Sequence, residues 1–196
     1  MNIPTPRQAL LAGSSILEAT LAPYGFAFVL RNEGRSFAGA FASGEFVRDD
    51  RRLELHYRGS LGQVQYHAAR EKATHEAYMR ELGVWRKCKY PGFSSEFLEV
   101  FQALAHDLMF TDDFLTGDAS VLISAAARES IANAARSERL TADYVGDTRE
   151  IETMQARFRE KRYAEVVAIF DRLHSPHLLS DAQLRLVQLA RERADT

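Results

Sequence analysis

The sequence predicts an α+β fold with an N-terminal helix, a four- or five-stranded antiparallel meander and an all-helical C-terminal half. Three observations lead to this prediction. Apolar residues recur at helical spacing up to residue 21, alternate with a period of two between residues 26 and 66, and return to helical spacing from residue 94 onward. Strands followed by a run of helices are typical of α+β proteins.

The first helix has clear start and stop signals. Thr5 can cap the helix, Pro6 suits its first position, and Gln8 completes a capping box. An apolar stripe follows up to Leu21, and Pro23 then ends the helix because proline cannot continue it.

Four tight turns predict the meander over residues 25–68. We expect them at Glu33-Gly34, Ser43-Gly44, Asp50-Arg51 and Gly59-Ser60. These turns place the large apolar side chains on one face: Phe26, Phe28, Leu30, Phe37, Phe41, Phe46, Leu53, Leu55, Tyr57, Val64 and Tyr66. An alternative is a long bent strand with a bulge at Gly44.

The turns also predict cross-strand pairs. The first three imply that Leu30 faces Phe37, that Phe41 faces Phe46, and that Phe46 faces Leu55. The last implies four pairs: Leu55 with Val64, Leu53 with Tyr66, His56 with Gln63, and Arg52 with His67.

The opposite face of the predicted sheet has two parts. Near the first edge its side chains are small and apolar: Ala27, Val29, Ala38, Ala40, Ala42 and Val47. Near the other edge they are polar: Arg52, Glu54, His56, Arg58, Gln63, Gln65 and His67. We expect the apolar part to be covered by the C-terminal helices, by a partner or by a second copy of the chain.

Helices account for the rest of the sequence. A short helix from Thr74 ends at Gly83, and a connector runs from Val84 to Phe93. Apolar stripes then predict helices around residues 97–108, 123–134, 151–158, 163–173 and 184–189. The third is expected to begin after the capping box Asp147-x-x-Glu150. The predicted domains are residues 1–83 and a helical bundle or extension, residues 94–196, packed on them.

One segment shows a local family resemblance. Tyr163, Val166 and Phe170, with Pro176 after the helix, follow the spacing of an aromatic, a small residue, a second aromatic and a proline. This segment resembles the second helix of a tetratricopeptide repeat, although Lys161 replaces the usual glycine and no second copy recurs about 34 residues away. The resemblance implies a helical packing unit and a protein-binding role.

Composition and charge exclude several classes of protein. The chain has 196 residues, of which 46% are hydrophobic, with a single cysteine and a formal net charge of -2. This composition disfavours disorder and disulfide-stapled folds, and no apolar run is long enough to span a membrane. The N-terminus lacks a leader pattern, so we expect a cytoplasmic protein. The acidic stretch 94–118 carries no basic residue, and we therefore expect no nucleic-acid partner.

Catalytic and metal-binding patterns are weak. In the predicted register His56 and His67 are offset by four residues, roughly 13 Å at the usual strand rise, which one ion cannot bridge. His67 with His75 and Glu76 remains a possible ligand set, but no metal motif supports it. Cys88 has no histidine close in sequence, which predicts an inert thiol. We therefore expect no metal and no cofactor.

Two functions remain open. We expect a non-enzymatic cytosolic protein-interaction or regulatory module of bacterial type, such as an adaptor or a toxin-immunity-type protein. It would bind another protein or itself through the small apolar sheet face or the acidic 94–118 segment. The alternative is a small-ligand-binding or hydrolytic domain with a cavity on the polar sheet face, where His56 finds hydrogen-bonding partners. Its residues would be Arg52, Glu54, His56, Arg58 and His67.

Overall fold

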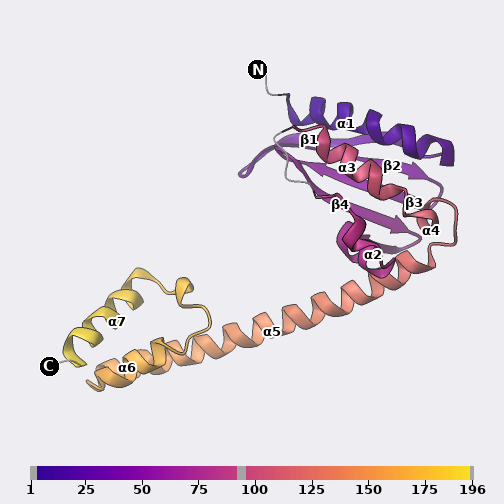
Figure 1. Ribbon diagram of the computed structural model, residues 1–196. Helices are drawn as coiled ribbons and strands as arrows, with labels where there is room; N and C mark the ends of the chain where they lie inside the picture. Colours follow the sequence, from indigo (N-terminus) through magenta and orange to yellow (C-terminus); the bar gives the residue numbers. More distant parts are fainter. Residues whose placement is uncertain (1–3, 92–95, 195–196) are drawn as a thin grey trace. The chain divides into compact units, whose positions relative to one another are not determined.

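The computed structural model describes residues 4–91 and 96–194 and confirms the α+β class (Figure 1). An N-terminal helix is followed by a five-stranded antiparallel sheet and a helical C-terminal half. The last two residues of the predicted connector, 92–93, and the first two of the predicted helical half, 94–95, lie outside the described residues. The chain forms two compact units, Met1–Ile131 and Ala132–Thr196, which are described separately below.

Helix α1, Pro6–Leu21, begins as its sequence predicts. The Gln8 backbone N–H donates to Thr5 Oγ1 at 3.3 Å, and the Gln8 side-chain oxygen accepts from the Thr5 N–H at 2.9 Å. These two bonds form the capping box. The 3₁₀ turn η1, Ala22–Tyr24, ends the helix at Pro23.

Five strands form a meander in the order β1-β2-β3-β4-β5, and every neighbouring pair is antiparallel. Their bounds are β1 Ala27–Ser36, β2 Gly39–Arg48, β3 Arg51–Tyr57, β4 Leu61–Ala68 and β5 Glu71–Thr74. The register predicted from Gly59-Ser60 is confirmed in all four pairs: Leu55 with Val64, Leu53 with Tyr66, His56 with Gln63, and Arg52 with His67.

The first two predicted turns are wrong. The chain passes straight through Glu33-Gly34 and Ser43-Gly44, because β1 and β2 are ten-residue strands that pair from Ala27 with Val47 to Ser36 with Gly39. The reversal therefore occurs at residues 37–38. The alternative of one long strand through Gly44 is confirmed, but the register shift falls on the partner strand β1, between Leu30, which pairs with Gly44, and Asn32, which pairs with Ser43.

This correction changes which face some side chains occupy. Phe41 and Phe46 lie five residues apart on one continuous strand, so they point to opposite faces instead of pairing. For the same reason Ala42 lies in the core and not on the outer face. Phe46 faces Leu53 and not Leu55, because Arg48 pairs with Arg51 and the reversal lies one residue earlier than predicted.

The core lies between one face of the sheet and the helices of the first unit. Helices α1 and α3, Glu99–Leu108, lie side by side over this face (Figure 1). The side chains that they share with the sheet are fully buried: Leu10, Leu17, Phe46, Leu53, Leu55, Tyr66, Phe101 and Leu104. Most of the predicted apolar face is therefore correct. The exceptions are Phe41, which points to the opposite face, and Phe37, which is fully exposed at the hairpin reversal.

Short helices complete the first unit. Helix α2, His75–Glu81, confirms the short helix predicted from Thr74, which caps it, and Gly83 adopts the left-handed φ of 72° after its end. The 3₁₀ turn η2, Trp85–Lys87, lies in the connector, and α4 covers Asp112–Leu115.

Helix α5, Ser120–Arg159, is a single helix of 40 residues, so the predicted start near Asp147 is wrong. The Asp147 carboxylate does not cap its own helix. It accepts hydrogen bonds from the backbone N–H groups of His174 at 3.0 Å and Ser175 at 2.8 Å. In the first unit α5 buries Leu122, Ala125 and Ala126, whereas the predicted stripe with Ile123 and Ile131 is exposed.

The second unit contains α6, Tyr163–Phe170, the 3₁₀ turn η3, Pro176–Leu178, and α7, Asp181–Ala194. The buried residues of its small core are Met154, Val166, Ile169, Val187 and Ala190. None of the described helices combines the length and the apolar composition that a membrane span requires.

Candidate functional site

The sheet face opposite the core carries a cavity of about 280 Å³. The helices of the first unit pack on the face that contains Leu53 and Leu55, so this outer face is not covered by them. The cavity is lined by residues of β1, β2 and β3: Arg31, Asn32, Ser43, Gly44, Glu45, Arg52, Glu54 and His56. We refer to these residues as the sheet-face site.

Glu45 is the most buried charge of the sheet-face site, with a side chain only 6% exposed. Strand pairing places it directly opposite Glu54, and two such carboxylates would repel each other. Arg31 compensates, because its Nε donates to Glu45 Oε1 at 2.6 Å. Arg52 adds a second cation, with Nη1 3.7 Å from Glu45 Oε2. The buried carboxylate thus fixes two half-exposed guanidinium groups beside the cavity.

Glu54 joins the two histidines of this face. Its Oε1 lies 2.8 Å from His56 Nε2, and its Oε2 lies 2.9 Å from His67 Nε2. The predicted four-residue offset of the histidines is present in the strand register. Because Glu54 lies between them, its two oxygens nevertheless reach both rings. Among the described residues, these three side chains do not form a group with the close donor spacing of a metal site.

The electrostatics of this group favour an ionised Glu54. Burial alone would raise the pKa of Glu54, but hydrogen bonds from His56 and His67 outweigh it and lower the pKa. Burial lowers the pKa of His67, and Arg52 adds to the effect because its Nη2 lies 3.2 Å from His67 Nδ1. A neutral His67 ring that carries its proton on Nε2 satisfies both contacts, since Nδ1 then accepts from Arg52.

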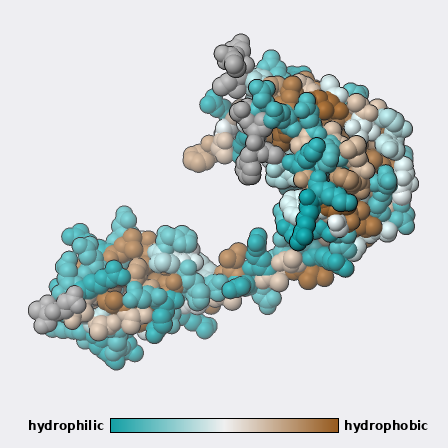
Figure 2. Space-filling view, viewed as in Figure 1, coloured by the Kyte–Doolittle hydropathy of each residue, from teal (hydrophilic) through white to brown (hydrophobic). Residues whose placement is uncertain are grey.

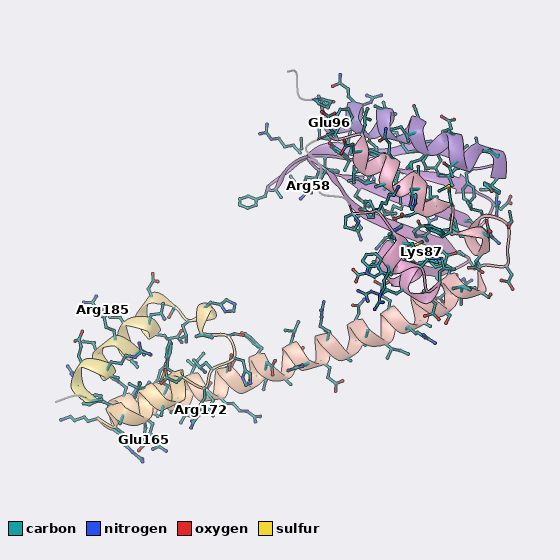
Figure 3. The ribbon with its side chains drawn as sticks, viewed as in Figure 1. Arg58, Lys87, Glu96, Glu165, Arg172 and Arg185 are labelled. Atoms are coloured by element: carbon teal, nitrogen blue, oxygen red, sulfur yellow. The ribbon has the colours of Figure 1, made fainter. Side chains whose placement is uncertain are left out.

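Three of the five residues predicted for this face line the cavity: Arg52, Glu54 and His56. His67 lies beside them through Glu54. Arg58 does not line the cavity; it lies near the β1–β2 hairpin (Figure 3), with its guanidinium carbon 5.8 Å from the Phe41 ring centroid.

Sequence reasoning missed the contribution of β1 and β2, including Arg31, Ser43 and Glu45. The predicted turn at Ser43-Gly44 placed Glu45 directly after a turn, and not in the middle of a strand that pairs with the strand of Arg52. The signal that could have placed them on the polar face was the alternation of Ser43 and Glu45 with Ala42, Gly44 and Phe46 in the sequence.

The sheet-face site offers two cationic side chains and a serine on the strand next to a histidine. Ser43 lies directly opposite His56 across the β2–β3 pair, but no hydrogen bond joins these two described side chains. His56 Nε2 instead contacts Glu54. The half-exposed Arg31 and Arg52 are suited to hold a carboxylate of a ligand or partner.

A second polar cluster lies in the interior of the first unit. Tyr66 Oη lies 3.0 Å from His75 Nδ1, and His75 Nε2 lies 3.1 Å from Asp107 Oδ2. Cys88 approaches the same group. Burial raises the pKa of the Cys88 thiol to about 11, and Asp107 contributes to the rise. This shift is the opposite of what an activated nucleophile needs. The fold nevertheless brings a histidine close to Cys88 that the sequence does not place there, since His75 belongs to this group.

No family model, curated protein or solved structure matches the chain. The resemblance of the segment around Tyr163 to a tetratricopeptide repeat therefore remains local, although α6 and α7 do pack against each other as helices.

Proposed function

We propose that the chain is a non-enzymatic protein-binding module of the cytoplasm that docks through the end of the β1–β2 hairpin and the adjoining sheet-face site. The observation that carries this proposal is Phe37, a large apolar side chain fully exposed at the reversal of the hairpin. Exposed aromatic residues of this kind are typical anchors of protein interfaces.

The hairpin extends beyond the rest of the sheet. Strand β2 pairs with β3 only from Ala42 to Arg48, so residues 34–41 form a two-stranded ribbon without a third strand. Every residue from 31 to 38 is exposed. Figure 1 shows the ribbon reaching past the other strands, and Figure 2 shows mildly hydrophobic atoms at its end.

The end of the ribbon is suited to binding and does not stabilise the fold. A two-stranded ribbon is marginally stable in water, and an exposed ring contributes nothing to the core. Burying a phenylalanine side chain in a partner contributes about 2 kcal/mol, which corresponds to roughly 30-fold in affinity.

The sheet-face site supports the same role. Arg31 lies at the base of the ribbon, and Arg52 lies beside it on the open face. Their guanidinium groups are about half exposed, at 51% and 47%, and can pair with carboxylates of a partner protein. An apolar anchor at the end of the ribbon, with two arginines at its base, fits an adaptor, a regulatory subunit or a toxin-immunity-type protein.

The test is site-specific photocrosslinking in cells of the source organism. A photoreactive phenylalanine analogue at position 37 is expected to give one discrete crosslinked species, which mass spectrometry then identifies. Binding of the purified partner to Phe37→Ser is expected to weaken roughly 30-fold, with Phe37→Leu recovering most of the affinity. The same analogue at Met109, which is 61% exposed, serves as the control.

The proposal fails if position 37 crosslinks no more than position 109, or if Phe37→Ser binds the identified partner as tightly as the parent chain. A crosslink between two copies of the chain would identify self-association as the interaction.

A second candidate function rests on the cavity of about 280 Å³ beside Arg52, Glu54 and His56. Small-ligand binding at this position predicts that succinate or citrate raises the melting temperature, and that Arg52→Met abolishes the increase. Arg70→Met, at an exposed position, is the matched control. Turnover of p-nitrophenyl acetate that is lost in Ser43→Ala would indicate the hydrolytic form of this candidate.

A further inference from the structure

We propose that His75, Cys88 and Asp107 form a binding site for a zinc ion in the first unit. One donor atom of each residue lies within 4.8 Å of the donor atoms of the other two. His75 begins α2, Cys88 follows η2, and Asp107 lies in α3. Among the described residues, this is the one group of three or more such donors with this spacing.

The donor set selects the type of ion. An imidazole nitrogen, a thiolate sulfur and a carboxylate oxygen are all ligands that zinc accepts. Calcium and magnesium prefer oxygen ligands alone, so Cys88 and His75 disfavour them. Three protein ligands also leave the fourth position of a tetrahedral ion for a water molecule.

Neighbouring groups already orient the donors. Asp107 Oδ1 accepts from the backbone N–H of Lys89 at 2.8 Å, and Oδ2 accepts from the N–H of Tyr90 at 2.9 Å. On the other side, Tyr66 Oη lies 3.0 Å from His75 Nδ1 and holds the ring. Metal-binding histidines and carboxylates are commonly oriented by outer hydrogen bonds of this type.

The cluster is also complete without an ion, since His75 Nε2 contacts Asp107 Oδ2 at 3.1 Å. The chain therefore folds before the ion binds. On binding, the Cys88 thiol releases its proton to solvent, and the remaining thiolate coordinates zinc. His75 moves its proton from Nε2 to Nδ1, where the N–H donates to Tyr66 Oη. Binding thus releases one proton, and the affinity for zinc should increase with pH.

A hollow of about 340 Å³ beside His75 offers an access route. Its lining includes the carboxylates of Glu76 and Glu129, together with His75, Trp85 and Tyr90. Carboxylates at the mouth of a site raise the local concentration of cations.

The experiment uses the full chain, purified after expression in zinc-supplemented medium and also as a cobalt-exchanged form. Elemental analysis is expected to find one zinc per chain, and cobalt is expected to produce a thiolate-to-cobalt charge-transfer band. Zinc should raise the melting temperature, and a chelator should reverse the increase. Cys88→Ser, a nearly isosteric change, should abolish the band and weaken zinc binding by roughly 100-fold.

The matched control is His174→Ala, which removes an exposed imidazole that lies 3.3 Å from a carboxylate oxygen of Asp147. It should leave zinc binding and the cobalt band unchanged. Folding of each variant is checked by circular dichroism. Zinc absent from the parent chain, with no change in melting temperature on zinc addition, overturns the proposal. So does equal zinc affinity in the parent chain and Cys88→Ser.

Discussion

His75 Nε2 and Asp107 Oδ2 lie 3.1 Å apart in the interior of the first unit, where His75 is 3% exposed and Asp107 is fully buried. The contact joins α2 to α3, and the two backbone N–H groups at Lys89 and Tyr90 attach the intervening connector to the same carboxylate. Asp107 in α3 therefore holds α2 and the connector through hydrogen bonds to its carboxylate. Burial alone would raise its pKa, but the hydrogen bonds from His75 and its other partners lower it.

Removal of this carboxylate should be costly. Asp107→Ala leaves the Lys89 and Tyr90 N–H groups and His75 without their acceptor, and we expect a loss of about 3–5 kcal/mol in the free energy of unfolding. Urea denaturation followed by the fluorescence of Trp85 measures it. Asp112→Ala, at an exposed position, should change the value by less than about 0.5 kcal/mol. Similar losses in both variants would contradict the role assigned to Asp107.

Glycine is required at position 13 because helix α3 approaches α1 there. A Cβ at Gly13 would lie 2.3 Å from a ring atom of Phe101. Gly13→Ala should therefore destabilise the first unit by about 1–3 kcal/mol, although alanine normally favours helices. A lower thermal midpoint by circular dichroism is the expected result. Gly146→Ala in α5, where no atom lies within 4 Å of the added Cβ, should instead be neutral or stabilising.

Arg51 joins the β2–β3 reversal to the end of α4. Its guanidinium donates to the backbone carbonyls of Asp113, Phe114 and Gly117. Arg51→Met should cost about 2–3 kcal/mol in the free energy of unfolding, because several charge-assisted hydrogen bonds are lost together. Arg51→Lys should recover only part of this free energy, since an ammonium group cannot reproduce the forked hydrogen-bonding geometry of the guanidinium group. Full recovery by lysine in urea denaturation would show that charge alone matters.

The Glu54 group should make stability depend on pH. The pKa of Glu54 lies below its ordinary value of 4.5 in the folded state, so its contribution is present above that value and is lost as pH falls through the folded pKa. The pKa of His67 is below 6.5, so folding favours the neutral ring, and this contribution also declines as pH falls below 6.5.

Both contributions have the same sign. The urea midpoint should therefore decrease as pH falls below about 6.5, and Glu54→Gln should flatten the part of this decrease that lies below about pH 4.5. His177→Gln, at an exposed position, is the control and should retain the slope of the parent chain. If the urea midpoint of Glu54→Gln depends on pH in the same way as that of the parent chain, groups other than Glu54 control the loss of stability in acid.

The sequence by itself determined the fold class and the elements with strong local signals. The capping box at Thr5 and Gln8, the stop at Gly83 and the turn at Gly59-Ser60 each act over a few residues. Cross-strand register follows directly from such a turn, which is why the β3–β4 pairs could be predicted. The turn predicted at Ser43-Gly44 is wrong because glycine is needed there for close packing and not for a turn. A Cβ at Gly44 would lie 2.5 Å from the Phe28 ring.

Only the tertiary structure decided where side chains from distant segments meet. The capping pattern at Asp147 reads as a helix start, yet the carboxylate binds a loop 27 residues away. Likewise, His75, Cys88 and Asp107 lack any shared motif and meet because three elements pack on one core. Capping and turn signals act within a few residues of the chain. The contacts between these distant side chains instead depend on how the whole sheet packs against its helices.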